Sequence, residues 1–180
     1  MRVISGQWKG RALLVSPKFN GRPTTDFARE GLFNVLQNQL DWDGLNVLEL
    51  FAGTGAFGIE CASRGDVKVT ALELSRLHVD WIKKNYEHFG IKTNSVFVQD
   101  VLKYLGNNSQ PTYDLIFADP PFDLTQLSDL PEAAIPWLNQ NGIFVLEHPK
   151  SYNFELHPGF VKEKKYANVH FSFFKGPELS

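Results

Sequence analysis

The sequence contains a single cysteine, Cys61, among its 180 residues. One thiol excludes an internal disulfide and a cysteine-based metal cluster. Long apolar runs are also missing. No stretch approaches the ~20 residues that span a bilayer, and the N-terminus lacks the apolar core of a signal peptide. We therefore expect a cytoplasmic protein that does not enter a membrane.

The net charge is small as well, −2 at pH 7, and a charge of this sign by itself argues against a nucleic-acid-binding protein. The distribution of the charge changes this interpretation. Residues 1–30 hold six basic and two acidic residues, whereas the other 150 hold 12 basic and 18 acidic residues. A basic segment on an acidic body favours a polyanionic partner on one face, although a solvated charged surface has the same composition.

Short apolar strands alternate with helical segments from residue 46 onward. Strands are expected at residues 47–50, 67–72, 95–98, 113–118 and 143–146. Helices are expected at about 75–89 and 101–105, and a further helix is expected to follow the loop at 53–58 and to end near residues 64–65. This alternation predicts a parallel, doubly wound α/β sheet. Two final strands, 160–166 and 169–174, form an antiparallel hairpin, which fits the methyltransferase variant of the Rossmann architecture better than the dehydrogenase variant.

The N-terminal part has a different pattern. Residues 2–5 and 12–15 are expected to pair as a small hairpin, and a helix begins at Thr24 or Thr25 and runs to about Leu40. We expect one domain over residues 1–180, in which a basic hairpin extension (1–23) precedes a Rossmann-like core (24–180).

Residues 53–58 have the form GxGxxG directly after the strand at 47–50. Glycine lets the backbone turn sharply and approach a ligand, and the N–H groups at a helix start attract polar groups. Glu73 ends the next strand, where its carboxylate can accept hydrogen bonds from both ribose hydroxyls. The same pattern describes an NAD site, and a tight packing turn would also use these glycines.

Two further carboxylates favour S-adenosylmethionine over NAD. Glu49 lies just before the glycine loop, where it suits a cationic amine and sulfonium better than a pyrophosphate. Asp100 ends the third strand, where it can accept the N6 amino group of adenine. Each has an alternative explanation, because Glu49 could be a half-buried strand residue and Asp100 could cap the helix at 101–105.

Asp119-Pro120-Pro121-Phe122 follows the apolar strand at 113–118. The carboxylate and the proline carbonyls present oxygens without competing N–H donors. This arrangement suits an amino group that donates two hydrogens, such as the exocyclic NH2 of a base, and Phe122 offers a face for stacking. A plain Asp-Pro-Pro turn is the alternative.

With these motifs the chain resembles the class I S-adenosylmethionine-dependent methyltransferases, and within them it is similar to the bacterial family that methylates the N2 amino group of a guanine in 16S ribosomal RNA. The resemblance covers nearly the whole chain and rests on residues 4–11, 22–26 with 30–34, 50–55, 62–65 and 119–122. Gly31 departs from the pattern, because similar sequences more often carry a larger residue there; Asp66 is another departure.

The resemblance implies a mostly parallel seven-stranded sheet, S-adenosylmethionine as cofactor, and 16S rRNA as partner, free or within an assembled small subunit. It implies catalytic roles for Asp119, Pro120, Pro121 and Phe122. The residues expected to bind the cofactor are Glu49, Phe51, Gly53, Thr54, Gly55, Glu73, Leu74, Asp100, Val101 and Thr24. Those expected to contact RNA are Arg2, Trp8, Lys9, Arg11 and Arg22, with Trp8 equally able to serve as a hydrophobic plug.

Other side chains are excluded from the predicted site. The five histidines show no metal-ligand spacing, so no metal is expected, and His148 is expected at the surface. Cys61 is expected in the core, which disfavours carbon methylation through a cysteine nucleophile. Two alternatives stay open: an N-methyltransferase acting on DNA adenine or protein glutamine, and a non-catalytic Rossmann domain that binds a nucleotide or RNA.

Overall fold

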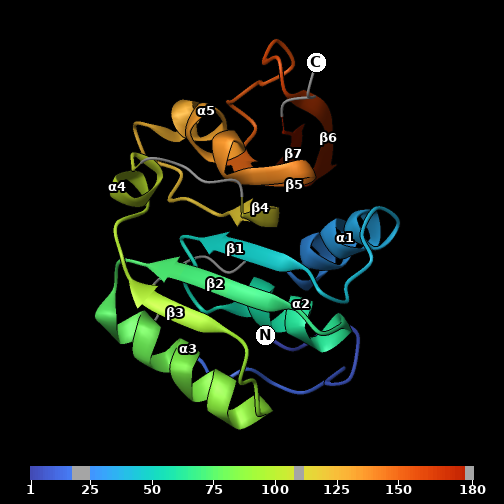
Figure 1. Cartoon of the computed structure of the whole chain (residues 1–180), viewed down its shortest axis with the longest axis vertical. Coiled ribbons are helices and arrows are strands. Elements are labelled where there is room, and N and C mark those ends of the chain that lie inside the picture. The colour runs from blue at the N-terminus through green and yellow to red at the C-terminus, as the bar shows by residue number, and fades with distance from the viewer. Residues whose placement is uncertain (18–24, 108–111, 177–180) are drawn as a thin grey trace.

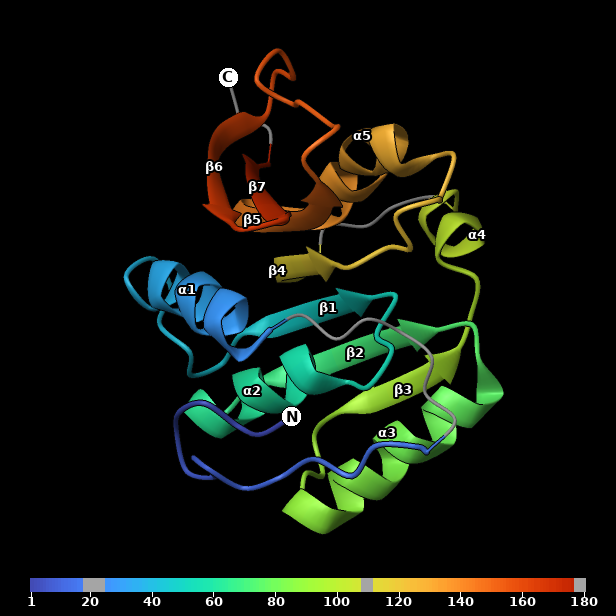
Figure 2. The same ribbon diagram turned by 180° about the vertical axis from the view of Figure 1, so that it is seen from behind.

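The computed structural model describes residues 1–17, 25–107 and 112–176. Within these residues seven strands form one sheet, in the order β3-β2-β1-β4-β5-β7-β6 (Figures 1 and 2). The strands are β1 (Asn46–Leu50), β2 (Lys68–Glu73), β3 (Ser95–Val98), β4 (Tyr113–Ala118), β5 (Leu138–Pro149), β6 (Phe160–Tyr166) and β7 (Val169–Lys175). The first five are mutually parallel, and β7 pairs antiparallel with both β5 and β6. The predicted mostly parallel sheet with a C-terminal hairpin is confirmed.

Helices cover both faces of the sheet. They are α1 (Asp26–Gln37), α2 (Ala56–Arg64), α3 (Arg76–Phe89), α4 (Val101–Leu105) and α5 (Leu130–Ala134), with short 3-10 turns at Leu127–Asp129 and Ile135–Trp137. One core joins α1 and α2 to the sheet, and a neighbouring core joins α2 to α3. A third core, on the opposite face, contains α4 and α5. This alternation arises because successive strand residues point to opposite faces.

Element boundaries follow the sequence expectations with three differences. Thr25 caps α1 by accepting from the Ala28 amide, but the helix ends at Gln37, before Leu40. β5 extends beyond the apolar stretch 143–146 on both sides. The expected N-terminal hairpin is reduced to one antiparallel bridge between Arg2 and Ala12.

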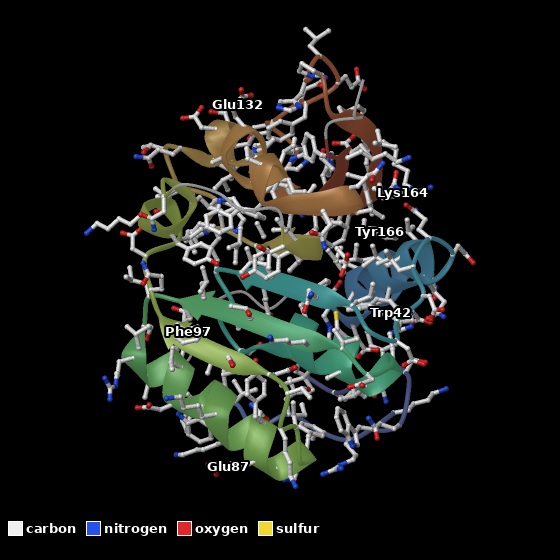
Figure 3. The ribbon with its side chains drawn as sticks, in the orientation of Figure 1. Trp42, Glu87, Phe97, Glu132, Lys164 and Tyr166 are labelled. Atoms are coloured by element: carbon white, nitrogen blue, oxygen red, sulfur yellow. The ribbon has the colours of Figure 1, made fainter. Side chains whose placement is uncertain are left out.

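The departure at Gly31 has a structural counterpart on β6. A Cβ atom built on Gly31 would lie 2.2 Å from Cε1 of Tyr166, so the tyrosine ring occupies the space that a larger residue on α1 would fill. Phe27, one turn earlier on α1, meets the same ring edge-on, with ring centroids 5.8 Å apart. Figure 3 shows Tyr166 on the side of the sheet where α1 and β6 meet.

The described helices include none that is both long and apolar enough to cross a membrane.

Candidate functional site

The predicted site residues gather where the parallel strands end. Leu50 at the end of β1 pairs with Leu72 on β2 and with Ala118 on β4. The residues that follow these positions therefore emerge at one edge of the sheet. They include Phe51, Glu73 and Asp119, and the Asp119 amide donates to the Leu50 carbonyl at 3.5 Å. Ligands of open α/β sheets bind at this carboxyl edge.

The glycine loop combines three left-handed backbone positions: Phe51 (φ 56°), Gly53 (φ 54°) and Gly55 (φ 72°). Glycine adopts this conformation without the penalty that a side chain brings. At Gly55, the residue before α2, a Cβ atom would also lie 3.0 Å from Cγ1 of Ile82 on α3. The loop therefore needs glycine here both for its conformation and for its close packing against α3.

Glu73 holds the loop in place. Its Oε2 accepts from the Gly53 amide at 2.8 Å, and its Oε1 accepts from the Ser75 amide, also at 2.8 Å. His78 lies nearby, with Nδ1 3.5 Å from Oε1. Each carboxylate oxygen has a second lone pair, so Glu73 can accept further hydrogen bonds while it holds the glycine loop.

Glu49 is buried beneath α2, only 2% exposed, and accepts from the Gly58 amide at 3.2 Å. A Cβ atom on Gly58 would lie 2.7 Å from the Oε2 atom of Glu49, so the glycine makes room for the carboxyl group. Burial raises the pKa of Glu49 to about 8, and the negative charges of Glu73 and Asp119 add to this effect. The alternative of a half-buried strand residue does not fit, because Glu49 is fully buried, and its perturbed pKa is typical of groups at binding sites.

At the end of β3, Asp100 caps α4 by accepting from the Lys103 amide at 3.0 Å. The capping role left open by the sequence is therefore real. Val101 behind it is buried, whereas Leu74 after β2 is 70% exposed and Val98 at the end of β3 is 45% exposed. Val98 pairs with Glu73, so exposed apolar surface lies beside the carboxylates at this edge.

The Asp-Pro-Pro-Phe turn continues directly from β4. Asp119 is partly exposed, Pro120 is buried, and Phe122 is 39% exposed. The Leu124 amide donates to the Pro121 carbonyl at 2.9 Å and closes the turn. An aromatic face and a carboxylate thus lie a few residues apart at the strand end.

Glu147 is a site neighbour that the sequence interpretation missed. It lies on β5, one residue after Leu146, which pairs with Ala118 on β4. Its side chain is 3% exposed. Asp119 follows Ala118 just as Glu147 follows Leu146, so the two acidic residues occupy corresponding positions along the neighbouring chain segments. The signal for it was the parallel sheet itself, because strand ends of neighbouring parallel strands lie together.

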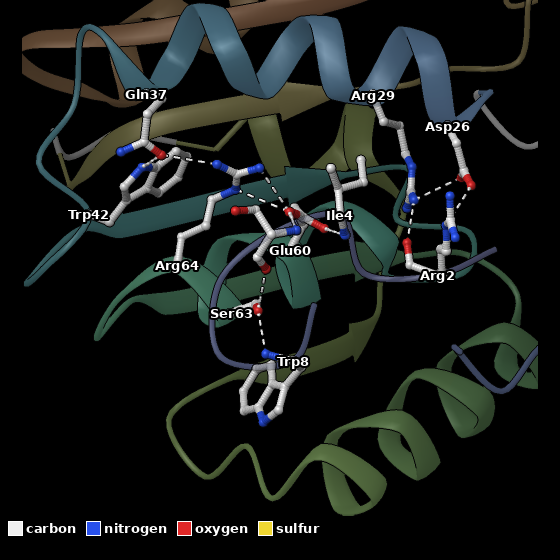
Figure 4. A network of polar contacts seen from close by, with 11 residues as sticks. Arg2, Ile4, Trp8, Asp26, Arg29, Gln37, Trp42, Glu60, Ser63 and Arg64 are labelled. Atoms are coloured by element: carbon white, nitrogen blue, oxygen red, sulfur yellow. Dashed lines mark hydrogen bonds and ion pairs between the residues drawn. The ribbon is translucent and has the colours of Figure 1, made fainter. Parts of the chain in front are cut away.

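The N-terminal segment is tied to α2 by polar contacts (Figure 4). Glu60 accepts from the Ile4 amide at 2.7 Å and from the Ser5 amide at 2.9 Å, and Arg64 pairs with the same carboxylate at 2.9 Å. The Trp8 amide donates to Ser63 Oγ at 3.1 Å. The segment is a docked part of the fold and not a projecting hairpin.

The predicted RNA-contacting residues divide into two groups. The Trp8 ring packs on Phe89 with ring centroids 5.4 Å apart, and the Arg11 guanidinium lies over the same Phe89 ring, 4.6 Å from its centroid. Arg2 and Lys9 are exposed. The Trp8 ring is partly buried against the core that contains α2 and α3, while Thr24 and Arg22 lie outside the described residues.

Other expectations concern residues away from this edge. Cys61 is fully buried in α2, as predicted, and burial raises the pKa of its thiol. His148 is fully buried as well, so the expectation of a surface residue is wrong. A hollow of about 430 Å³ lies at the opposite end of β1 and β2 and is lined by Gly44, Leu45, Asn46, Asp66, Lys68 and Thr93.

Comparison with known proteins decides the family. The model of the family described as conserved hypothetical protein 95 matches residues 1–175. The chain belongs to this family. It is 31% identical to the ribosomal RNA small subunit methyltransferase D of Buchnera aphidicola subsp. Baizongia pistaciae, covering 97% of this chain and 91% of the relative. Identity to the protein of the same name from Haemophilus influenzae is 35%, over 83% and 79% of the two chains.

A solved structure from Escherichia coli, described as a candidate methyltransferase, superposes with a TM-score of 0.84. It is 28% identical and covers 98% of this chain and 99% of its own. The fold of this family member is therefore the Rossmann-like methyltransferase fold, and the resemblance inferred from its motifs is confirmed.

Proposed function

We propose that this protein transfers a methyl group from S-adenosylmethionine to the exocyclic N2 amino group of a guanine in 16S ribosomal RNA. The observation that carries the proposal is the Asp119-Pro120-Pro121-Phe122 turn at the end of β4, beside the glycine loop that follows β1. Membership of a family whose curated members include small-subunit rRNA methyltransferases supports the same substrate class.

The residues of the carboxyl edge fit the cofactor. Glu73 would accept hydrogen bonds from the ribose hydroxyls, and the loop of Phe51, Gly53, Thr54 and Gly55 would approach the ligand with backbone atoms; the contact of Glu73 with the Gly53 amide supports this assignment. The exposed side chain of Leu74 and the buried Val101 would line the adenine, and Asp100 would accept its amino group. Thr24 is proposed from the sequence alone.

Glu49 gives this assignment its electrostatic basis. Its carboxyl group has a pKa of about 8 because it is buried. A cation close to the group would favour its ionised form and offset the cost of burial. The negative charge of a pyrophosphate would make ionisation of the buried Glu49 carboxyl group still less favourable. Glu49 therefore favours a cationic ligand, such as the amine of S-adenosylmethionine, over a dinucleotide.

The cofactor supplies an electrophilic methyl group on a sulfonium. The protein must then hold a poorly nucleophilic amine in line with that methyl, because the N2 lone pair is delocalised into the ring. The Asp119 carboxylate and the Pro120 carbonyl accept hydrogen bonds from the two N–H groups of the amine. They also stabilise the positive charge that develops on its nitrogen in the transition state. Phe122 stacks against a base drawn out of its RNA structure. Asp119 positions the amine, and the proton released after transfer can pass to water.

RNA is proposed to approach along the basic N-terminal segment. Lys9 and Arg2 are exposed and can contact phosphates. Arg22 is proposed for the same role from the sequence. Trp8 and Arg11 are already engaged with Phe89, so their contribution is to fix the shape of this surface.

The experiment that tests the function is incubation with labelled S-adenosylmethionine and, separately, small ribosomal subunits, free 16S RNA, DNA and bulk protein from cells lacking the enzyme. Label in N2-methylguanine of an RNA sample supports the proposal and identifies the assembly state of the substrate. Label in adenine of DNA or in glutamine keeps the cofactor assignment but overturns the substrate. Cofactor binding without transfer to any sample would support the non-catalytic alternative.

A further inference from the structure

Three polar side chains from neighbouring strands meet in the antiparallel part of the sheet. His148 on β5 pairs with His170 on β7, and Glu163 on β6 pairs with Ser172, two residues further along β7. The three side chains of His148, Glu163 and His170 place one nitrogen or oxygen each within 4.8 Å of one another. Both histidines are buried, and Glu163 is partly buried.

The carboxylate of Glu163 is oriented by its other contacts. Its Oε1 faces both rings, 2.9 Å from Nδ1 of His170 and 3.8 Å from Nε2 of His148. Its Oε2 is held by the Lys165 ammonium at 2.9 Å. One oxygen is therefore directed at the two imidazoles while the other is fixed by a cation.

The ring of His148 is oriented from its far side. Its Nδ1 lies 3.0 Å from the Pro149 carbonyl, which can only accept, so Nδ1 carries the proton. Its Nε2 therefore accepts a hydrogen bond from the Ser172 hydroxyl, 2.8 Å away, and a bound metal ion would take over this lone pair. A backbone carbonyl that fixes the second ring nitrogen is the usual support of a metal-binding histidine.

We propose that His148, Glu163 and His170 bind a divalent metal ion of the zinc class. Zinc bonds of ~2.0–2.2 Å in tetrahedral geometry require ligand atoms about 3.3 Å apart. The separations of 2.9 Å and 3.8 Å around Glu163 Oε1 lie on either side of this value. Binding through these atoms would require the His170 ring to carry its proton on Nε2, so that Nδ1 presents a lone pair. The two histidine nitrogens, which lie within 4.8 Å of each other, would move together as the ion is bound.

The surroundings match a metal site in two respects. The rings of Phe154 and Tyr152 lie 5.0 Å and 6.5 Å from the His148 ring, so apolar groups cover the cluster. Three protein ligands leave a fourth position for water, which Ser172 Oγ can hydrogen-bond.

The ion would join β5, β7 and β6 at the side of the sheet away from Glu49. His148 and Leu146 share a face with the core that contains α4 and α5, because they alternate with Glu147 along β5. The site is therefore distinct from the methyl-transfer site, and its role is to hold the C-terminal hairpin on the sheet. The expectation of no metal rested on spacing along the chain, which does not reveal ligands brought together by cross-strand pairing.

The test is metal binding by the full-length protein after treatment with a chelator. Titration with Zn2+ in calorimetry should show one saturable site, and Co2+ should give a visible spectrum typical of tetrahedral nitrogen and oxygen ligands. Mg2+, which prefers six oxygen ligands, should not compete. Zn2+ should also raise the melting temperature of the protein.

Two variants and one control make the test specific. His170→Gln and Glu163→Gln should each weaken Zn2+ binding at least tenfold and abolish the melting-temperature shift. His88→Gln removes an exposed imidazole on α3 and should leave both unchanged. The absence of saturable binding, binding that survives in both cluster variants, or an equal loss in the control would overturn the proposal. Circular dichroism of each variant establishes that it is folded.

Discussion

The two halves of the sheet gather polar side chains in different ways. In the parallel half, Glu73 and Asp119 come together because neighbouring strands end at one edge. In the antiparallel half, His148 and His170 lie side by side because they are directly paired residues of the neighbouring strands β5 and β7. The first arrangement places carboxylates beside a glycine loop, whereas the second joins its members through mutual contacts. We therefore expect changes in the parallel half to affect chemistry and changes in the antiparallel half to affect stability.

Replacing Asp119 should have the largest effect on activity. Asp119→Ala removes the acceptor proposed to orient the amine, so turnover should fall on the order of 1000-fold while cofactor affinity stays nearly unchanged. Turnover is measured by label transfer and affinity by calorimetry. Asp123→Ala, an exposed carboxylate in the same turn, should behave like the unaltered protein. Parallel losses of turnover and affinity in Asp119→Ala would remove the positioning role.

Glu49 should make stability depend on pH. Its pKa is raised from 4.5 to about 8 in the folded protein, so the stability linked to its proton is fully present below about pH 4.5 and lost as pH rises to about 8. The loss is on the order of 3–5 kcal/mol, at about 1.4 kcal/mol per pKa unit. Urea unfolding of Glu49→Gln should show this pH dependence reduced.

Glu87→Gln, which changes an exposed carboxylate on α3, is the control for Glu49 and should keep the pH dependence. The same variant pair tests ligand binding. Between about pH 5.5 and about pH 7.5, cofactor affinity should rise with pH in the unaltered protein and much less in Glu49→Gln. Identical profiles in both would mean that the cofactor does not interact with ionised Glu49.

Two glycines with the same backbone conformation separate strain from crowding. Gly55 and Gly90 both have φ 72°, but a Cβ on Gly55 would lie 3.0 Å from Ile82 whereas one on Gly90 has nothing within 4 Å. Gly90→Ala should cost about 1–2 kcal/mol of unfolding free energy. Gly55→Ala should cost about 2–4 kcal/mol and also weaken cofactor binding. Equal costs in denaturant titrations would show that α3 relaxes away from the loop.

Ser172 probes the antiparallel half with the smallest expected change. Ser172→Ala removes the hydroxyl 2.8 Å from His148 Nε2 in a buried setting. We expect a loss of about 1–2 kcal/mol in the metal-free protein with unchanged cofactor affinity and turnover. Ser95→Ala, at an exposed position on β3, is the control and should leave stability, cofactor affinity and turnover unchanged. A marked drop in turnover for Ser172→Ala would break the division between the two halves.

The same contrast explains what the sequence could reveal. The positions of the glycine loop and of Asp119 were predictable because each directly follows an apolar strand, and the C-terminal ends of parallel strands lie at one edge of the sheet. The burial of His148 was not predictable, because it depends on strands more than twenty residues apart. The ends of β5 were missed because only its apolar centre carries a hydrophobic signal, while pairing reaches Leu138 at one end and Pro149 at the other.

The N-terminal segment illustrates a different limit. Its residues alternate weakly, and the turns at Gly6 and Gly10 predicted a hairpin, yet its amides are satisfied by Glu60 and Ser63 of α2. The sequence does not show which backbone amides will donate to an acidic side chain, such as Glu60, that is buried in the middle of a helix. The choice between stacking and packing for Trp8 likewise needed the position of Phe89.

The contact between Gly31 and Tyr166 has an evolutionary consequence. A glycine in the interior of a helix costs about 0.5–1 kcal/mol relative to alanine, and here the vacated space is filled by a ring from β6. The two positions, 135 residues apart, can therefore change only together: a relative with a larger residue on α1 needs a smaller or displaced side chain at the hairpin. Between such relatives, a chimera that combines the larger residue on α1 with Tyr166 would contain a clash, and one that combines Gly31 with the smaller side chain would contain a cavity. We therefore expect stable chimeras of this family to inherit α1 and β6 as a pair.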